Sequence, residues 1–534
     1  MLLSWLYSWQ LVNSPDLSSL LKSLMRPSAI TVKQLLWLAL PSLAVGLFLR
    51  AALMLAIPEG YFGADSFSYY EFSHSLFNGD GIDLNEKRRW FYPIFLALLD
   101  GLPGPLWSLV PLFQHAIGLL TVLGIGWCSA QVVARPRLVV PLVTMLAAVW
   151  PRMLWYEHEF IAESLLLAAF VAVIALLLTP DIVRSRYGLI ALMMAFVLLA
   201  GMKGAGRFLW MGSVLSLFLI HRQPWRWRWG KISSSLAFFS IVLVSTIGKS
   251  SQGDWLALSS SLPLVRTEGE PYSFYREALK GQILEAREYG DDYPWVVKYY
   301  KKRLNSKSPD LVHPDWAALN QDDFQFSKVA RAFWSDGVLR NPLQFSAMTG
   351  KTMAIALSGS TLNSRLDPEN FWKAQAKRSA KTWHEDPQYF QRLFGLNKSE
   401  FEFRSAQGAE RQFVFLPAMR WVDRHLGWLG RGRGSSKGGP SGDFPVVQPK
   451  PLGLMASLGA VAGLVFSLKR LQCLALLLPL FLYMAGTYAV GDAVRRYLQP
   501  VDWVGFVLVG VLFDLIVQVI YGIGLSHKFR RVIS

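Results

Sequence analysis

Asp65 is the residue of this sequence best placed to act as a base. It follows the first long apolar run and stands in a polar segment that covers residues 58–91. Ionisable groups at the edge of an apolar run are costly to keep there, so they are the first candidates for a function. In surroundings of low polarity the pKa of a carboxyl group rises toward the value that suits a general base. Asp65 also precedes Ser-Phe-Ser-Tyr-Tyr, where it would suit the N-cap of a helix, and both roles stay open.

Two further carboxylates follow His158 where a later apolar run begins, Glu159 directly and Glu163 four residues further on. Residues four apart share one face of a helix, so the two acids are expected to lie together. Such a pair can bind a metal, orient a substrate hydroxyl, or stabilise the positive N-terminus of the helix. Only the third role is purely structural. Glu163 sits a turn inside the predicted run, which favours one of the other two roles.

Cations occupy two short polar connections that are predicted to face the outer side of a membrane. One connection holds Lys203 and Arg207, and the other reads Gly491-Asp492-Ala-Val-Arg495-Arg496-Tyr497. Positive residues normally gather on the inner side, so outer cations call for an outer anion. A lipid phosphate or pyrophosphate is the obvious one. The structural alternative is that these side chains only extend toward the membrane surface.

The elements that must position these groups are long apolar runs. An apolar helix needs about 20 residues to cross about 30 Å of hydrocarbon. Polar interruptions separate the runs, and the one at 203–207 divides 187–220 into a helical hairpin. The sequence predicts about ten crossings, near residues 34–57, 106–132, 137–151, 160–179, 187–202, 207–220, 232–249, 452–468, 471–489 and 501–522.

Basic residues between the runs set the orientation of the chain. With the N-terminus inside, every predicted cytoplasmic segment carries Lys or Arg, as the positive-inside rule requires. Removing any one helix would put several of these basic clusters on the opposite side. Both termini are therefore predicted to lie inside, and the cytoplasmic segments are residues 1–33, 133–137, 180–186, 221–231, 469–470 and 523–534.

The composition is typical of a membrane protein. Of 534 residues, 52% are hydrophobic and 17% are charged, where a soluble chain would carry about 25% charged residues. The formal net charge of +17 fits cytoplasmic loops near anionic lipid, so no nucleic-acid partner is predicted. The two cysteines, Cys128 and Cys473, lie in apolar runs and predict no disulfide.

The fold class that follows is an all-α polytopic membrane protein with a large, mostly helical extracytoplasmic insertion between the seventh and eighth crossings. Residues 1–33 form a cytoplasmic interfacial segment with an apolar helical stripe. Residues 34–249 form a transmembrane catalytic module. The extracytoplasmic domain covers 250–450 and ends in a Gly- and Ser-rich flexible linker, and 451–534 supply the C-terminal transmembrane helices.

Taken in order, these motifs resemble the GT-C superfamily of membrane glycosyltransferases, in the bacterial branch related to protein O-mannosyltransferases and the lipid A aminoarabinose transferase. The resemblance covers residues 34–250 and 450–520. It departs from the family at Ser66, which follows Asp65 where a second acid is frequent, so a paired-acid metal site is not expected in that segment. The residues that carry it are Asp65 with Tyr69, Gly79-Asp80, Arg89 with Tyr92-Pro93, Glu159 with Glu163, and Asp492 to Pro500.

The resemblance implies an enzyme that moves a sugar from a polyprenyl-phosphate carrier to a glycan, lipid or protein acceptor, on the outer side of a bacterial inner membrane. Asp65 is expected to take the proton of the acceptor, with Glu159 and Glu163 as further catalytic carboxylates, and direct displacement would invert the anomeric carbon. The departing phosphate needs fixed cations in a dry site. A divalent metal is left open. The expected phosphate-binding residues are Lys203, Arg207, Arg495 and Arg496, and those expected to position substrates are Tyr69, Arg89, His158 and Tyr497.

Two other functions fit part of the sequence. A transporter or flippase of an anionic lipid-linked sugar is favoured by the outer cations and by Asp514 inside the last run. Many transporters carry a two-fold hydropathy repeat, however, and none is visible in this sequence. A polysaccharide polymerase or ligase with a lipid diphosphate donor is favoured by the large outer segment 250–450, and the Asp65 segment argues against it.

Overall fold

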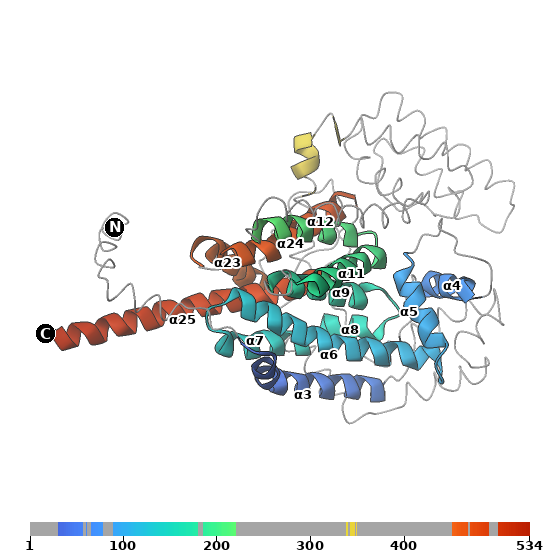
Figure 1. Cartoon of the computed structure of the whole chain (residues 1–534), viewed down its shortest axis with the longest axis horizontal. Helices are drawn as coiled ribbons and strands as arrows, with labels where there is room; N and C mark the ends of the chain where they lie inside the picture. The colour runs from blue at the N-terminus through green and yellow to red at the C-terminus, as the bar shows by residue number, and fades with distance from the viewer. Residues whose placement is uncertain are drawn as a thin grey trace, which may run out of the picture.

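The computed structural model is helical in the part of the chain that it describes, with no β-strand there. The described residues are 30–56, 60, 66–77, 89–179, 185–220, 338–339, 342–347, 349, 451–467, 470–490 and 500–533. Their main helices, labelled as in Figure 1, are α3 (Val32–Ala56), α4 (Ser66–Phe77), α5 (Phe91–Asp100), α6 (Leu106–Val132), α7 (Pro136–Val149), α8 (Pro151–His158), α9 (Glu163–Leu178), α11 (Arg186–Met202), α12 (Gly206–Ile220), α23 (Pro451–Val465), α24 (Arg470–Val490) and α25 (Asp502–Ile533).

These helices fall where the apolar runs predict them. A helix covers most of each run except 232–249, which lies outside the described residues. Within the described part of the chain, three helical stretches are long and apolar enough to cross a membrane: Val32–Leu55 in α3, Leu106–Val132 in α6 and Asp502–Tyr521 in α25. Helices α7 and α8, bent by 48° at the break between them, pass the same test together. The predicted number of about ten crossings stays a prediction.

The long helices lie side by side in one bundle (Figure 1). Helix α6 packs against α7 and α9, and α3 packs against α6 and α7. Later in the chain, α25 packs against α7 and α23, and α24 packs against α12. A small residue allows the last of these crossings, because a Cβ atom at Gly212 of α12 would lie 2.3 Å from Cα of Pro479.

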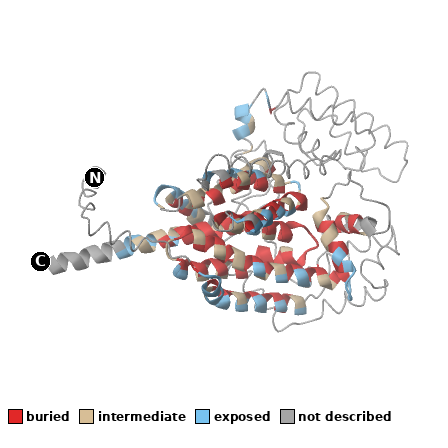
Figure 2. Cartoon of the chain, in the orientation of Figure 1, coloured by how far each residue is buried: buried red, intermediate tan, exposed pale blue. Residues whose placement is uncertain are grey.

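Large apolar side chains fill the centre of the bundle. Trp503 of α25 and Phe170 of α9 are fully buried and meet edge to face, with ring centroids 5.4 Å apart. Exposed residues lie on the outside of the helices (Figure 2). Many of them are large and apolar, such as Trp37 and Leu120, which are each 67% exposed. An apolar exterior is unfavourable in water and suits contact with lipid tails.

Two short helices, α4 and α5, come from the predicted outer segment ahead of α6. Helix α4 begins at Ser66, the residue after Asp65, and Asp65 itself lies outside the described residues. Helix α5 begins at Phe91, next to the Tyr92-Pro93 pair that predicts a helix start. The two helices pack against each other, and α5 also contacts α6 and α11. They therefore bring the first outer segment to one end of the bundle.

The polar interruption between α11 and α12 is a tight turn, as the sequence predicts. Helix α11 ends at Met202 and α12 begins at Gly206.

Of the predicted extracytoplasmic domain, the structure describes residues 338–339, 342–347 and 349, and the stretch 342–347 is helical. The predicted interfacial stripe at the N-terminus and the linker that ends the 250–450 region lie outside the described residues.

Candidate functional site

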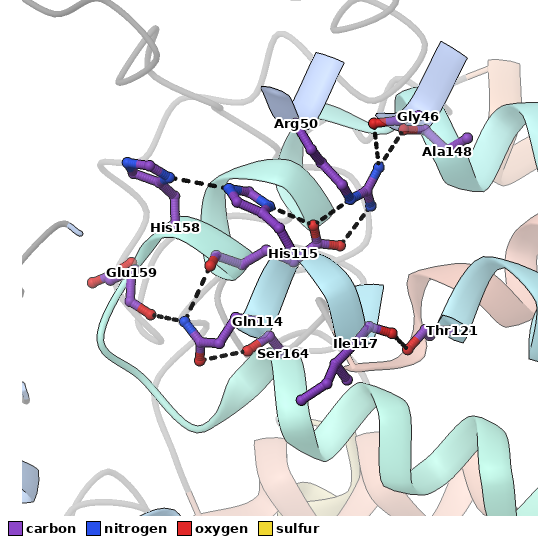
Figure 3. A network of polar contacts seen from close by, with 11 residues as sticks. Gly46, Arg50, Gln114, His115, Ile117, Thr121, Ala148, His158, Glu159 and Ser164 are labelled. Atoms are coloured by element: carbon purple, nitrogen blue, oxygen red, sulfur yellow. Dashed lines mark hydrogen bonds and ion pairs between the residues drawn. The ribbon is translucent and has the colours of Figure 1, made fainter. Parts of the chain in front are cut away.

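Four buried ionisable side chains form a chain from α3 to the end of α8 (Figure 3). Arg50 of α3 makes a two-point ion pair with Glu157 of α8: Nε lies 2.7 Å from Oε2, and Nη2 lies 2.7 Å from Oε1. Nδ1 of His115, on α6, lies 2.9 Å from the same Oε2, and its Nε2 lies 3.1 Å from Nδ1 of His158. Each of the four is at most 3% exposed. We call Arg50, Glu157, His115 and His158 the buried polar chain.

Local packing holds the charged end of the buried polar chain. The remaining nitrogen of Arg50, Nη1, donates to the carbonyls of Gly46 and Ala148, at 3.1 and 3.2 Å. The carboxylate of Glu157 lies against Gly118 of α6, where a Cβ atom would come within 2.1 Å of Oε1. A buried charge pair is stable only when its geometry is good and its other polar atoms are bonded. These contacts meet that requirement.

The junction between α8 and α9 corrects one expectation from the sequence. Glu159 and Glu163 do not share a helix face, because α8 ends at His158 and α9 begins only at Glu163. Glu159 has extended backbone angles, φ −98° and ψ 143°, so the chain leaves the helix there. Nε2 of Gln114, on α6, donates to the carbonyls of Glu157 and Glu159, at 3.1 and 2.8 Å. Gln114 thus supplies bonds that a continuous helix would otherwise provide.

The two carboxylates of the junction have different partners. Oε2 of Glu159 accepts a hydrogen bond from Nε1 of Trp155, at 3.1 Å. Glu163, whose side chain is fully buried, pairs with Nζ of Lys203 in the α11–α12 turn. The sequence predicts a lipid phosphate as the anion for Lys203, and the structure shows a carboxylate of the protein itself in contact with this lysine.

Arg89 and Arg207 come within electrostatic range of each other, just before α5 and at the start of α12. Phe91, the first residue of α5, packs on Gly201 of α11, where a Cβ atom would lie 2.1 Å from the ring. This contact brings Arg89 and Trp90, which precede α5, beside the turn that leads to Arg207. Burial, and then the charge of Arg207, lower the pKa of Arg89 to about 10, so Arg89 stays charged at neutral pH. We call Arg89 and Arg207 the cation pair.

Tyrosines connect α4 and α5 to the α8–α9 junction. Tyr92 of α5 is fully buried, and its hydroxyl donates to Oε1 of Gln114 at 3.3 Å. Tyr69 of α4 packs edge to face on Tyr92, with ring centroids 4.9 Å apart. The phenol of Tyr92 also lies within electrostatic range of Glu159 and Glu163. Helices α4 and α5 and the α8–α9 junction therefore belong to one site.

All seven of the predicted site residues that the structure describes lie at this end of the bundle. Among the described residues, no group of three or more His, Cys, Asp or Glu side chains could hold a metal ion. Asp65, Arg495, Arg496 and Tyr497 lie outside the described residues, so their places stay predictions. The residues that the structure brings together are Tyr69, Arg89, His158, Glu159, Glu163, Lys203 and Arg207.

The last helix is anchored beside the same site. Nη1 of Arg152, on α8, lies 2.8 Å from Oδ2 of Asp502, the first residue of α25. Nε1 of Trp150, at the bend between α7 and α8, donates to the same oxygen at 3.1 Å. The start of α25 therefore lies against the start of α8. This start follows the segment that carries Arg495 and Arg496 by only a few residues of sequence.

Asp514, whose place inside the last apolar run favours the transporter alternative, lies at the other end of the bundle. Its Oδ2 accepts from the backbone N–H of Ala134 and from Nε2 of Gln518, at 2.7 and 2.9 Å. Ala134 follows the end of α6 at Val132, about 25 Å along the helix axis from His115. Asp514 thus ties α25 to the α6–α7 turn and contributes nothing to the site.

Four residues of the site are absent from the sequence-based prediction: Arg50, Gln114, His115 and Glu157. Each is a polar side chain within or next to an apolar run, which is the signal that could have identified them. Their pairing is not visible in the sequence, because Glu157 is separated from His115 by 42 residues and from Arg50 by 107.

This arrangement supplies three kinds of chemistry at one end of the bundle. The cation pair can bind an anion such as phosphate, and the carboxylates and phenols of the junction can bind hydroxyl groups. The buried polar chain can accept a proton.

The sequence matches no protein-family model, and comparisons with curated proteins and with solved structures find no match to the chain.

Proposed function

We propose that this chain is a multi-pass membrane glycosyltransferase that moves a sugar from a polyprenyl-phosphate carrier to a glycan, lipid or protein acceptor. The observation that supports it best is the cation pair. Arg89 and Arg207 repel each other, so a phosphate bound between them would relieve that repulsion and gain charge-assisted hydrogen bonds. A lipid-linked phosphate reaches such a site from the membrane, with its tail in the hydrocarbon.

The reaction suits the residues around the cation pair. An acceptor hydroxyl is a weak nucleophile, so a carboxylate has to take its proton, and Asp65 is the candidate from the sequence. The acceptor oxygen bonds to the anomeric carbon, and the bond from that carbon to the phosphate oxygen breaks. The phosphate leaves with the electron pair, and fixed cations stabilise its charge. One direct displacement inverts the anomeric centre.

The α8–α9 junction would hold the sugar and the acceptor. Carboxylates and phenols bind hydroxyl groups well, and Tyr92 lies near both Glu159 and Glu163. Lys203 would act as a support in this scheme, because it neutralises the buried carboxylate of Glu163. Arg495, Arg496 and Tyr497 are proposed to complete the phosphate site.

The proposed setting is a bacterial inner membrane that the chain crosses about ten times. The basic segments between the apolar runs support an arrangement with both termini inside. In that orientation the α4–α5 segment, the α8–α9 junction and the α11–α12 turn all face outward. The site would then meet a lipid-linked donor and an acceptor on the outer side.

Binding of polyprenyl phosphate to the purified protein tests the proposal. We expect native mass spectrometry to show retention of polyprenyl phosphate well above retention of the uncharged polyprenol of the same length. Arg207→Met should weaken this binding about ten- to a hundredfold, which corresponds to about 1.5–3 kcal/mol for one charge-assisted contact. Arg137→Met is the matched control, because Arg137 is an exposed arginine at the start of α7, near the other end of α6. Equal binding of the alcohol and the phosphate would contradict the proposal.

A transporter of a lipid-linked sugar is the second candidate, and the buried polar chain is the observation that favours it. Chains of ionisable residues inside apolar helices are typical of proton-coupled transport. The two candidates differ in their product. A transferase separates the sugar from polyprenyl phosphate, whereas a transporter moves the intact lipid between the leaflets of a liposome.

A further inference from the structure

The buried polar chain has a fixed direction of hydrogen bonding. A carboxylate can only accept hydrogen bonds, and Glu157 is held as a carboxylate by the two-point contact with Arg50. The ring nitrogen of His115 that faces Glu157, Nδ1, must therefore carry a hydrogen and donate it. The carboxylate of Glu157 thus determines which nitrogen of His115 carries the hydrogen.

The direction continues into the second histidine. In a neutral imidazole one nitrogen donates and the other accepts, so Nε2 of His115 is the acceptor. Nδ1 of His158, which lies 3.1 Å away, must then be the donor. It follows that Nε2 of His158 holds the lone pair of the neutral chain. When the histidine pair takes up one proton, Nε2 of His158 carries a hydrogen whichever of the two rings holds the positive charge.

We propose that His158 is the proton acceptor of the site, and that Arg50, Glu157 and His115 are positioning residues that keep its Nε2 basic. A carboxylate behind a histidine fixes the tautomer of the ring and stabilises the imidazolium that forms. Here the carboxylate acts through one additional imidazole. Gly118 is part of the same device, because only a residue without Cβ leaves room for the carboxylate of Glu157.

Other charges near the chain are already balanced within the protein. Among the described helices that pack around α6 and α8, Glu163 of α9 is paired with Lys203, and Asp502 of α25 is paired with Arg152 of α8. Glu159 follows His158 directly and accepts from Trp155. Arg50 and Glu157 cancel each other. A proton on the histidine pair therefore adds a net positive charge to this cluster, and the carboxylate that contacts the pair is that of Glu157.

The source of the proton rests on the proposed function, whereas the direction of the chain does not. In the proposed transfer the acceptor hydroxyl gives its proton to a carboxylate of the site. The carboxylic acid so formed then passes the proton to Nε2 of His158, the nitrogen that the direction of the chain leaves without a hydrogen. The carboxylate is then ready for the next turnover, and the imidazolium releases the proton to water after the products leave.

Nitrogen NMR of protein labelled with 15N only at its 8 histidines tests the chain without any substrate. Difference spectra with His158→Gln and His115→Gln assign the two rings. At pH 8 we expect both rings to carry a hydrogen on Nδ1 and none on Nε2. When the pH is lowered, we expect one proton to be taken up at Nε2 of His158. In Glu157→Gln the fixed tautomers should be lost. Because this variant leaves Arg50 without its carboxylate, Arg50→Gln/Glu157→Gln is measured as well.

A hydrogen on Nε2 of His158 at pH 8 would overturn the inference, and so would a histidine pair that takes up no proton at any pH at which the protein stays folded. Transfer assays with a sugar-labelled polyprenyl phosphate give a separate readout. His158→Gln should slow repeated turnover tenfold or more, while the first turnover, in which a carboxylate takes the proton, keeps its rate. An equal loss in both phases would assign His158 a structural role. If no sugar is transferred but the NMR result holds, the proposed function fails and the proton acceptor stands.

Discussion

Arg50 and Glu157 lie 107 residues apart in the sequence, and the structure joins them through two contacts of 2.7 Å inside the bundle. The pair links α3 to α8, and through His115 it also reaches α6. A buried ion pair contributes little net stability compared with well-packed apolar residues. Its placement therefore fits a role in holding the histidines better than a role in folding alone.

Removal of Arg50 should destabilise the protein strongly. Arg50→Leu leaves the carboxylate of Glu157 buried without its cation, and the expected loss is about 3–5 kcal/mol in the free energy of unfolding. Arg50→Leu/Glu157→Leu should recover much of this loss, because both charges are then gone. Lys33→Leu, at an exposed cation near the start of the same helix, should change little. Chemical unfolding in detergent micelles measures all three, and an Arg50→Leu variant as stable as Lys33→Leu would contradict the prediction.

Gly118 and Gly505 form a matched pair of glycine positions. Gly118→Ala places a methyl group 2.1 Å from Oε1 of Glu157, and that oxygen is fixed by Arg50. We expect a loss of about 1–3 kcal/mol from overpacking. At Gly505 the nearest atom to an added Cβ is 3.8 Å away, so Gly505→Ala should be neutral or stabilising by up to about 1 kcal/mol. The same unfolding experiment compares them, and equal effects would mean that Glu157 is not held against Gly118.

The sequence predicts the helices well and the site only in part. Apolar runs and polar turns identify α3, α6 and the α11–α12 turn, because a membrane leaves a single local solution for each run. The prediction that Glu159 and Glu163 share one helix face was wrong, because the helix breaks between them. Gln114, 43 residues before Glu157, bonds the carbonyls at this break, and the local sequence pattern does not reveal it. Partners of buried charges are set by tertiary packing, so Arg50 and His115 could be identified as unusual without being paired.

Lys203 and Arg207 should respond differently to removal of their charge. Lys203→Met takes the cation from the buried carboxylate of Glu163, so the free energy of unfolding should fall by about 1.5–3 kcal/mol. Arg207→Met removes the repulsion with Arg89, so stability should fall less than in Lys203→Met while binding of polyprenyl phosphate weakens. Thermal stability and lipid binding are measured on both variants. The reverse pattern would assign phosphate binding to Lys203.

The side of the membrane on which the site lies can be read from cysteine labelling. The native Cys128 and Cys473 are buried, so they should not react. Leu102→Cys and Gly204→Cys place thiols at exposed positions of the α5–α6 and α11–α12 connections. A membrane-impermeant maleimide should label both in intact cells, whereas Arg137→Cys and Lys33→Cys should react only after permeabilisation. Labelling of Leu102→Cys and Arg137→Cys from the same side would contradict the topology.

The central claim is that this protein transfers a sugar from a lipid phosphate. The measurement that tests it most directly records the loss of the sugar from the lipid-linked donor. Purified protein in liposomes is supplied with polyprenyl phosphates that carry labelled hexoses or pentoses, together with an extract of bacterial envelope as the source of acceptor. We expect one of these donors to lose its sugar to an acceptor and to yield polyprenyl phosphate. Asp65→Asn should lower this rate roughly 10²–10⁴-fold with donor binding nearly intact, whereas an N-cap would tolerate the change. Full release of polyprenyl phosphate by the Asn variant, or no release by the wild-type protein from any donor, would contradict the account.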